Sequence, residues 1–280
     1  MNDANELAWL LEGAAKIAQQ AGDLIMEQYE EQAYATYEKS DASPVTSADL
    51  AAHRLITAKL NALTPDIPVL SEEGAHLSLE ERQQWPRYWL IDPIDGTQEF
   101  IARSGDFTVV IALVVGQQPT LGIIYWPAGD KLYLAQRGAG AFRRDVNGEQ
   151  QLQVRKVAKP KDDPLILAIS RRQPRERVLA RMNPDRELST LPAGSCSLKA
   201  CLIAEGAADC FLRVGPTGEW DTAAAEVIVS EAGGSIVSEH FKPLTYNQEA
   251  NLGNPNFLIL GDAQVPWQQV FIRHQTHPEA

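Results

Sequence analysis

The chain of 280 residues is long enough for one large domain or two closely packed ones, because single hydrophobic cores stop growing at about 250 to 300 residues. Its 44% hydrophobic and 22% charged residues are ordinary for a globular protein. The net charge of −12, from 37 acidic and 25 basic residues, argues against binding to a nucleic acid polymer but not against a small phosphorylated ligand, since divalent cations can reverse the local sign.

The N-terminal stretch and the cysteines favour a cytoplasmic location. The N-terminal stretch carries acids where a signal peptide needs basic residues, and no unbroken apolar stretch reaches the roughly 18 residues that span a bilayer. Cys196, Cys201 and Cys210 have neither a CxxC pair nor the spacing of zinc ligands. We therefore expect free thiols in a reducing compartment and no integral membrane segment.

Periodic apolar residues and turn signals place the elements of the first half. Apolar residues at steps of three and four predict a helix over roughly the first thirty residues. A second helix is expected to begin at Thr46, which stands three residues before Asp49 in a capping-box arrangement. Strands that end in loops are predicted in two stretches, IPVLSEEG and YWLIDPIDGT. An antiparallel meander is expected from three further runs with short connectors, FTVVIALVVG, TLGIIYW and KLYLAQ.

The pattern changes after about residue 160, where predicted strands and helices alternate. Strands are predicted in LILAIS, ADCFLRVG and FLILG, and helices in CSLKACLIAEG and DTAAAEVIVSEAGG as well as after LILAIS and after FLILG. Pro160 and Pro164 mark the expected boundary between an α+β domain of residues 1–160 and an α/β domain of residues 161–280, packed as a single compact unit. The terminal HQTHPEA is expected to be dispensable.

Acidic residues stand at the ends of several predicted elements. They are Asp49, Glu72, Glu73, Asp92, Asp95 and Asp221. Singly, each is more simply explained as a helix cap or a turn residue, because Asp is common in both places. Together they indicate chemistry, because loops at strand ends can bring carboxylates together, and Mg²⁺ prefers such oxygen ligands along with water and substrate phosphate.

The DPIDGT stretch places metal ligands beside groups suited to an anion. The proline fixes the backbone between Asp92 and Asp95, so both carboxylates and the Ile94 carbonyl can face one site. Gly96 and Thr97 follow with backbone N–H groups for an anion, and Thr97 adds a hydroxyl. The sequence therefore predicts that acids for metal and amides for phosphate lie side by side.

Three separated segments carry a resemblance to a known superfamily. In this order, LSEE, DPIDGTQEF and EWDTAAAEVIVSEAGG are similar to the motifs of the lithium-sensitive, magnesium-dependent phosphatases that include inositol monophosphatase. Within that superfamily, the stretches around DPIDGTQEF and EWDTAAAE are most similar to the bacterial CysQ-type 3′(2′),5′-bisphosphate nucleotidases. The resemblance covers nearly the whole chain. It implies an α+β / α/β fold, a layered αβαβα sandwich with an antiparallel N-terminal sheet and a smaller C-terminal α/β layer.

The resemblance also implies metal and catalytic roles. Two or three Mg²⁺ ions, which Mn²⁺ can replace, are expected on Glu72, Asp92, Ile94, Asp95 and Asp221, with Glu73 outside the ligand set. A metal-bound water is then the nucleophile, activated near Thr97, whose hydroxyl Asp49 orients; Glu72 is counted with these two as catalytic. Such metals lower the pKa of water and neutralise charge on the attacking and leaving oxygens, so no covalent phosphoenzyme is needed.

The substrate site implied by the resemblance comprises Glu72, Ile94, Asp95, Gly96, Thr97, Ser195, Lys199, Arg213 and Asp221. Arg213 stands where inositol phosphatases carry an acid, and it would favour a second phosphate because Arg pairs with phosphate in a bidentate fork. Lys199 matches a position near the nucleotide in the bisphosphate nucleotidases, and Ser195 lies close by in the sequence, although plain surface charge also explains Lys199 and Arg213. Gln173 stands where relatives carry a histidine, near Ser170, and this departure leaves adenine recognition open.

The leading hypothesis is a Mg²⁺-dependent phosphomonoesterase that removes the 3′-phosphate of adenosine 3′,5′-bisphosphate, giving AMP and phosphate in sulfur metabolism or nucleotide detoxification. Its expected partner is a small phosphorylated nucleotide. A monomer or homodimer is expected, in the cytoplasm or peripherally at the inner membrane as in some relatives. The alternative within the superfamily is an inositol or sugar phosphatase.

Two alternatives of other kinds stay open. DGT after a strand is also typical of haloacid-dehalogenase phosphatases, with Asp92 as the phosphorylated nucleophile, but here the acids are three positions apart instead of two. A noncatalytic cation-binding module would need the acids but neither Thr97 nor Asp49. The presence of those two residues favours an enzyme.

Overall fold

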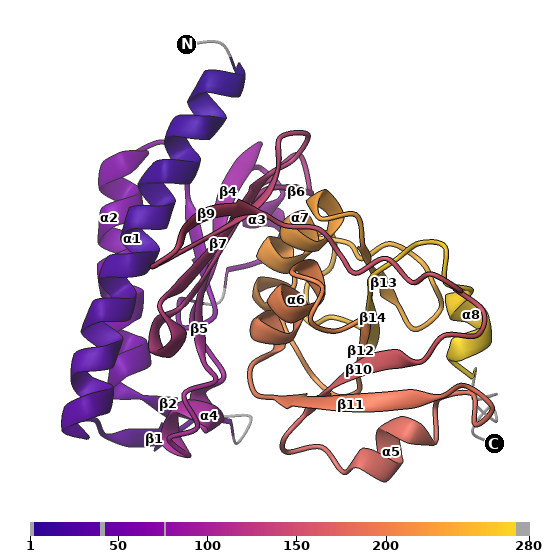
Figure 1. Cartoon of the computed structure of the whole chain (residues 1–280). Helices are drawn as coiled ribbons and strands as arrows, with labels where there is room; N and C mark the ends of the chain where they lie inside the picture. Colours follow the sequence, from indigo (N-terminus) through magenta and orange to yellow (C-terminus); the bar gives the residue numbers. More distant parts are fainter. Residues whose placement is uncertain (1–2, 40–42, 76, 273–280) are drawn as a thin grey trace, which may run out of the picture.

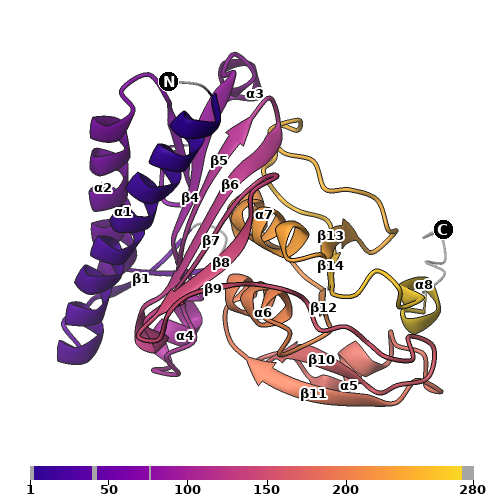
Figure 2. The ribbon, with the colours of Figure 1, turned by 45° about the horizontal axis from the view of Figure 1, so that its top comes forward.

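The computed structural model describes residues 3–39, 43–75 and 77–272, so the terminal HQTHPEA lies outside the described residues. Over these residues the strands form a seven-stranded sheet, a five-stranded sheet and a two-stranded ribbon. Two helices cover the outside of the larger sheet, α1 (Asp3–Glu31) and α2 (Ser47–Leu63) (Figure 1). Two others lie between the sheets, α6 (Cys196–Ala204) and α7 (Ala223–Glu231) (Figure 2).

The larger sheet has the strand order β3-β4-β5-β6-β7-β8-β9, with β3 parallel to β4 and the following pairs antiparallel. Its strands are β3 (Val69–Ser71), β4 (Arg87–Asp95), β5 (Thr108–Val115), β6 (Gln118–Trp126), β7 (Lys131–Gln136), β8 (Gly140–Asp145) and β9 (Gly148–Gln151). The meander predicted for β5 to β7 is confirmed. The sequence did not predict β8 and β9, because GAFRRD and GEQQ lack an apolar pattern.

The smaller sheet has the strand order β11-β10-β12-β14-β13 and mixes parallel and antiparallel pairs. Its strands are β10 (Leu165–Ser170), β11 (Leu188–Ala193), β12 (Cys210–Arg213), β13 (Ser235–Ser238) and β14 (Phe257–Leu260). The short helices α5 (Arg175–Leu179) and α8 (Trp267–Val270) pack on its outer side (Figure 1). The αβαβα sandwich expected from the sequence is therefore confirmed.

Several short elements connect these layers. They are β1 (Thr36–Glu38), β2 (Pro44–Thr46), α3 (Leu79–Arg82), α4 (Thr97–Ile101) and the 3₁₀ turns η1 (Pro127–Gly129) and η2 (Glu219–Asp221). The larger sheet ends at Gln151 and the smaller one begins at Leu165, while α7 of the second half packs on β6 of the first. The division at residue 160 stays a prediction.

Burial on both faces explains why β5 reads as an almost continuous apolar run, TVVIALVV. Ile111 and Leu113 face the core beneath α1 and α2, whereas Val110 and Ala112 face the core beneath α6 and α7. A slip of one residue would exchange the two faces, so this packing fixes the register of β5 against β4. The position at which β4 ends is fixed with it.

Gly122→Ala is expected to lower the free energy of unfolding by about 1–3 kcal/mol. A Cβ at Gly122 in β6 would lie 2.3 Å from the Ala224 carbonyl oxygen, so α7 would have to shift. Gln118→Ala, at the exposed start of the same strand, is the control and should change stability by less than about 0.5 kcal/mol. Urea unfolding followed by circular dichroism measures both variants. Equal urea midpoints for Gly122→Ala and the wild type would show that α7 packs less tightly on β6 than this contact indicates.

Cys196, Cys201 and Cys210 are buried and free, as expected. Over the described ranges, no helix combines the length and the apolar character that a membrane crossing requires. The cytoplasmic location, the peripheral association and the monomer or homodimer stay predictions.

Candidate active site

Three carboxylates from distant parts of the chain meet at the end of β4. Oxygens of Asp92, Asp95 and Asp221 all lie within 4.8 Å of one another. Asp92 and Asp95 close β4, where Pro93 cannot donate to the ladder and the register with β5 shifts between the two acids. Asp221 ends η2 just before α7, and its Oδ2 accepts from the Gly218 N–H at 2.6 Å. A strand end and a helix start therefore bring these acids together.

Burial and mutual repulsion make this cluster unfavourable without a cation. Burial raises the pKa of Asp92 well above its ordinary value, and the charges of Glu72 and Asp95 raise it further. Burial also raises the pKa of Asp221, again with Asp95 and Glu72 adding to the effect. Carboxylate oxygens at this spacing suit a hard divalent cation, which would offset the repulsion. The donor set therefore fits the Mg²⁺ that the sequence predicts.

Glu72 reaches the cluster from the end of β3. Its N–H donates to the Ile91 carbonyl at 3.1 Å, because β3 runs parallel to β4 and both strands end at the same edge. Lys39 Nζ lies 2.8 Å from Glu72 Oε1 and 2.5 Å from Glu73 Oε1. Burial opposes the charged form of Lys39, but the two carboxylates outweigh burial and raise its pKa. Sequence reasoning missed Lys39, since a lone lysine after a short strand resembles surface charge.

Thr97 and Asp49 form a hydrogen-bonded pair beside the acids. Thr97 begins α4 directly after Gly96, whose φ of 98° suits glycine. Thr97 Oγ1 donates to Asp49 Oδ1 at 2.9 Å. The other Asp49 oxygen accepts from the N–H and the hydroxyl of Thr46, at 2.8 and 2.5 Å, in the capping box predicted for α2. The start of α2 thus fixes Asp49, and Asp49 fixes the Thr97 hydroxyl.

The start of α6 holds the Asp95 carboxylate. Ser195 Oγ donates to Asp95 Oδ2 at 2.7 Å. The N–H groups of Ser197 and Cys196 donate to the Asp95 oxygens Oδ2 and Oδ1 at 2.6 and 3.3 Å, in the way that a helix N-terminus stabilises negative charge. Ser195 therefore contacts a predicted metal ligand. Sequence reasoning missed Ser197, although its place in the first turn of a predicted helix was a usable signal.

A cavity of about 560 Å³ opens beside the carboxylates. Of the predicted site residues, it is lined by Glu72, Asp92, Ile94, Asp95, Gly96, Thr97, Arg213 and Asp221. Its lining also includes residues that sequence reasoning missed, among them Leu77, Thr217, Trp220, Asn251 and Leu252. These lie in loops and a short turn, where neither periodicity nor charge pattern identifies a residue. The cavity joins the acids to a partly apolar wall.

Two residues of the cavity lining, Arg213 and Thr217, carry buried polar groups. Arg213 ends β12, and its Nη2 donates to the Pro216 carbonyl at 2.8 Å. Within the described part of the chain, Arg213 Nε and the Thr217 hydroxyl are buried without a hydrogen-bond partner. Such groups are unfavourable unless a ligand or water satisfies them. Gln173 and Ser170 lie outside the described lining, so adenine recognition stays open.

Other predicted site residues lie behind the described lining, namely Asp49, Ser195 and Lys199. Lys199 is 2% exposed, and its ammonium donates to the Gly194 carbonyl at 2.7 Å and to the Ser195 carbonyl. The same ammonium lies 4.9 Å from the centre of the Phe211 ring. A contact between Lys199 and substrate stays a prediction.

Known proteins match this chain along nearly its whole length. Residues 6–264 match the Inositol monophosphatase family. The 3′(2′),5′-bisphosphate nucleotidase CysQ of Haemophilus influenzae is 43% identical over 265 residues, which cover 94% of this chain and 96% of the relative. The nucleotidase of the same name from Escherichia coli strain K12 is 41% identical over 251 residues, which cover 89% of this chain and 99% of the relative.

Solved structures share the fold of this chain. CysQ from Bacteroides thetaiotaomicron, a bacterial member of the inositol monophosphatase family, has a TM-score of 0.76 at 35% identity, over 90% of this chain and 96% of that one. The extragenic suppressor protein suhB from Bartonella henselae has a TM-score of 0.76 at 25% identity, over 93% and 96%. With its motifs, its layered fold and its acid cluster, the chain belongs to the inositol monophosphatase family.

Proposed function

We propose that this chain is a Mg²⁺-dependent 3′(2′),5′-bisphosphate nucleotidase that converts adenosine 3′,5′-bisphosphate to AMP and phosphate, in sulfur metabolism or nucleotide detoxification. The observation that carries the proposal is a single cavity lined by the acid cluster, by Thr97 and by Arg213. Relatives at 43% and 41% identity carry the name of this nucleotidase. The haloacid-dehalogenase alternative is set aside, because the chain belongs to another family.

We assign the metal site to Glu72, Asp92, Asp95, Asp221 and the Ile94 carbonyl, for two or three Mg²⁺ ions that Mn²⁺ can replace. Oxygens of three of these side chains lie within 4.8 Å of one another, and Glu72 and Ile94 line the same cavity. When bound, the ions supply Lewis acidity to the phosphoryl group and lower the pKa of coordinated water. The chain's own contribution is to hold five oxygen-bearing groups around one space.

Thr97 and Asp49 are assigned to proton handling. Because Thr97 Oγ1 donates its proton to Asp49 Oδ1 at 2.9 Å, its lone pairs stay available to accept a hydrogen bond from the attacking water. The water oxygen forms a bond to phosphorus, and the bond from phosphorus to the 3′ oxygen breaks. The leaving oxygen takes up a proton and becomes the 3′ hydroxyl of AMP. In this sequence of steps no side chain is phosphorylated.

Arg213→Met is expected to raise KM for adenosine 3′,5′-bisphosphate by about 10- to 100-fold, since a hydrogen bond to a charged group contributes about 1.5–3 kcal/mol. We assign Arg213 to the second phosphate because it lines the cavity and its buried Nε has no partner among the described residues. Methionine keeps much of the length of the side chain and removes its charge. Steady-state phosphate release measures the effect.

The matched control for this variant is a substrate, 3′-AMP, which lacks the second phosphate. Arg213→Met should leave KM for 3′-AMP within about threefold of the wild-type value. A similar rise of KM for both substrates would show that Arg213 supports the shape of the cavity instead of recognising the second phosphate.

The substrate class is tested by turnover of the wild-type chain with Mg²⁺. We expect kcat/KM to be higher for adenosine 3′,5′-bisphosphate than for inositol 1-phosphate, because a neutral polyol leaves Arg213 without a counter-charge. Faster hydrolysis of inositol 1-phosphate would favour the alternative substrate class. Hydrolysis of no phosphomonoester at all would favour the noncatalytic cation-binding module.

A further inference from the structure

Ser195 contacts a proposed metal ligand from an unusual backbone conformation. Its φ is 38°, in the left-handed region that side chains other than glycine rarely adopt. In this conformation its Oγ donates to Asp95 Oδ2 and accepts from the Leu198 N–H at 3.0 Å, which caps α6. Strained backbone of this kind persists only where its surroundings fix it. The surroundings of Ser195 therefore influence the direction of the Asp95 carboxylate.

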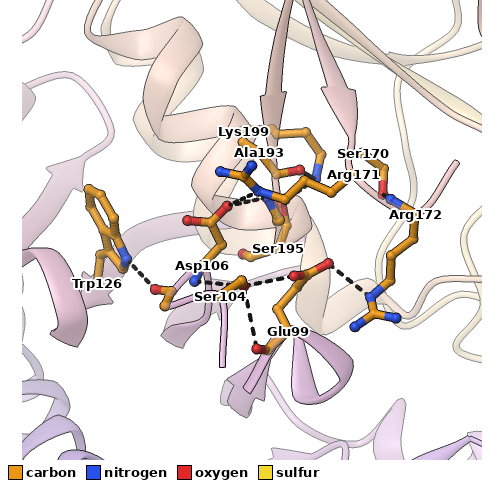
Figure 3. A network of polar contacts seen from close by, with 12 residues as sticks. Glu99, Ser104, Asp106, Trp126, Ser170, Arg171, Arg172, Ala193, Ser195 and Lys199 are labelled. Atoms are coloured by element: carbon orange, nitrogen blue, oxygen red, sulfur yellow. Dashed lines mark hydrogen bonds and ion pairs between the residues drawn. The ribbon is translucent and has the colours of Figure 1, made fainter. Parts of the chain in front are cut away.

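Asp106 fixes the segment that leads into Ser195 (Figure 3). It lies between α4 and β5, is 8% exposed, and accepts from the Gly194 N–H at 2.7 Å through its Oδ2. The same oxygen accepts from Arg171 Nε, just after β10, at 2.8 Å. A hydrogen bond to an ionised acceptor is about twice as strong as a neutral one. Asp106 thus joins the loop before β5, the loop after β10 and the start of α6.

Neighbouring contacts hold Asp106 itself in place (Figure 3). Its N–H donates to Ser104 Oγ at 3.2 Å, and Ser104 Oγ donates to Glu99 Oε2 at 2.7 Å. Trp126 Nε1 donates to the Gly105 carbonyl at 2.7 Å. The loop before β5 is therefore held at the two residues that precede the aspartate and at the N–H of the aspartate itself.

Close packing joins the loop of Asp95 to the same aspartate. A Cβ at Gly194 would lie 2.5 Å from Asp106 Cβ, so a larger residue would push the two segments apart. A Cβ at Gly96 would lie 3.1 Å from the Asp106 carbonyl oxygen and 3.4 Å from Ser195 Cβ. Gly96 directly follows Asp95. A displacement of Asp106 would therefore reach both the loop that carries Asp95 and the segment that holds it.

We propose that Asp106 is a positioning residue for the metal site: it fixes Gly194 and Ser195, and through them the direction of the Asp95 carboxylate. The inference rests on the metal site of the proposed function and adds a residue behind the described cavity lining. Mg²⁺ demands near-ideal octahedral geometry, so a displaced ligand lowers its affinity. Arg171 contributes less than Asp106 to this positioning, because the Arg171 side chain is half exposed and exposed ion pairs are weak.

The test is calorimetric titration of Mg²⁺ into metal-free protein, below the unfolding midpoint of each variant. Asp106→Ala removes the acceptor and is expected to weaken Mg²⁺ binding by about 10- to 100-fold. Asp106→Asn keeps an oxygen where both donors meet, so its affinity should stay within about threefold of wild type. If the alanine variant fails to fold, Asp106→Ser removes the same acceptor position and should show the same loss.

Asp209→Ala is the matched control. Asp209 is 1% exposed, accepts from the Ile166 N–H at 2.6 Å and pairs with Arg155, but its described contacts reach no residue of the metal site. The Asp209→Ala substitution should lower the Tm and leave the Mg²⁺ affinity unchanged. Unchanged affinity in Asp106→Ala and Asp106→Ser, or an equal loss in Asp209→Ala, would overturn the inference. Wild-type protein that binds Mg²⁺ without hydrolysing the bisphosphate would contradict the proposed function alone.

Discussion

Thr97→Ala is expected to lower kcat on adenosine 3′,5′-bisphosphate by about 10²- to 10⁴-fold, the range typical of a positioned proton acceptor. Thr97 lines the cavity, and its hydroxyl proton points to Asp49 Oδ1. The substitution leaves every carboxylate of the site in place, so calorimetric Mg²⁺ affinity should stay within about twofold of wild type. KM should change less than kcat, because the proposed contact strengthens in the transition state.

Thr97→Ser is the matched control for this prediction. It keeps the hydroxyl that donates to Asp49 and removes one methyl group, so it should retain most of the wild-type kcat. Wild-type turnover by Thr97→Ala would contradict the role assigned to Thr97. Loss of Mg²⁺ binding along with turnover would instead place its effect on the metal site.

Asp92→Asn is expected to raise the Tm of the metal-free chain and to abolish most of the Tm increase that Mg²⁺ produces. Without metal, burial and the charges of Glu72, Asp95 and Asp221 disfavour an ionised carboxylate at position 92, and asparagine removes that cost. With Mg²⁺, the wild type gains stability because the folded chain binds the ion, whereas the variant has lost a ligand. Its kcat/KM should fall by about 10³-fold or more, because bound ions supply several kcal/mol of transition-state stabilisation.

Thermal unfolding after dialysis against a chelator, repeated along a Mg²⁺ titration, measures both effects. Asp66→Asn is the control, because Asp66 is an exposed acid in a turn and its substitution should leave the Mg²⁺ response unchanged. A lower Tm for metal-free Asp92→Asn than for the metal-free wild type would show that burial and repulsion at Asp92 do not destabilise the folded chain. A variant with the wild-type Mg²⁺ response would remove Asp92 from the ligand set.

The elements that the sequence predicts are those whose burial leaves an apolar pattern. α1 shows apolar steps of three and four because one face packs on the larger sheet, and β5 is apolar throughout because both faces are buried. The strands β8, β9 and β11 were not predicted, since most of their residues are exposed or half-buried. Main-chain hydrogen bonds to neighbouring strands hold these three strands in their sheets, and such bonds require no particular side chains.

In the site, the sequence indicates which residues take part but not where their side chains point. The acids could be predicted because their residue type and their place at element ends are visible in the sequence, and the structure brings Asp92, Asp95 and Asp221 together. The direction of a side chain could not be predicted. The Lys199 ammonium contacts backbone carbonyls at the start of α6, and Lys39 pairs with Glu72 from a ribbon whose position no sequence pattern indicates.

Hydrolysis of adenosine 3′,5′-bisphosphate by metal-free chain, before and after Mg²⁺ is added, in heavy-oxygen water, tests whether a water molecule attacks the phosphate with the help of a bound cation. We expect no phosphate release before the addition. After it, AMP and phosphate should appear in equal amounts, with the heavy oxygen in the phosphate and none in the AMP. Phosphate release that does not depend on a divalent cation, heavy oxygen in the AMP, or an intact bisphosphate after Mg²⁺ addition would contradict the account.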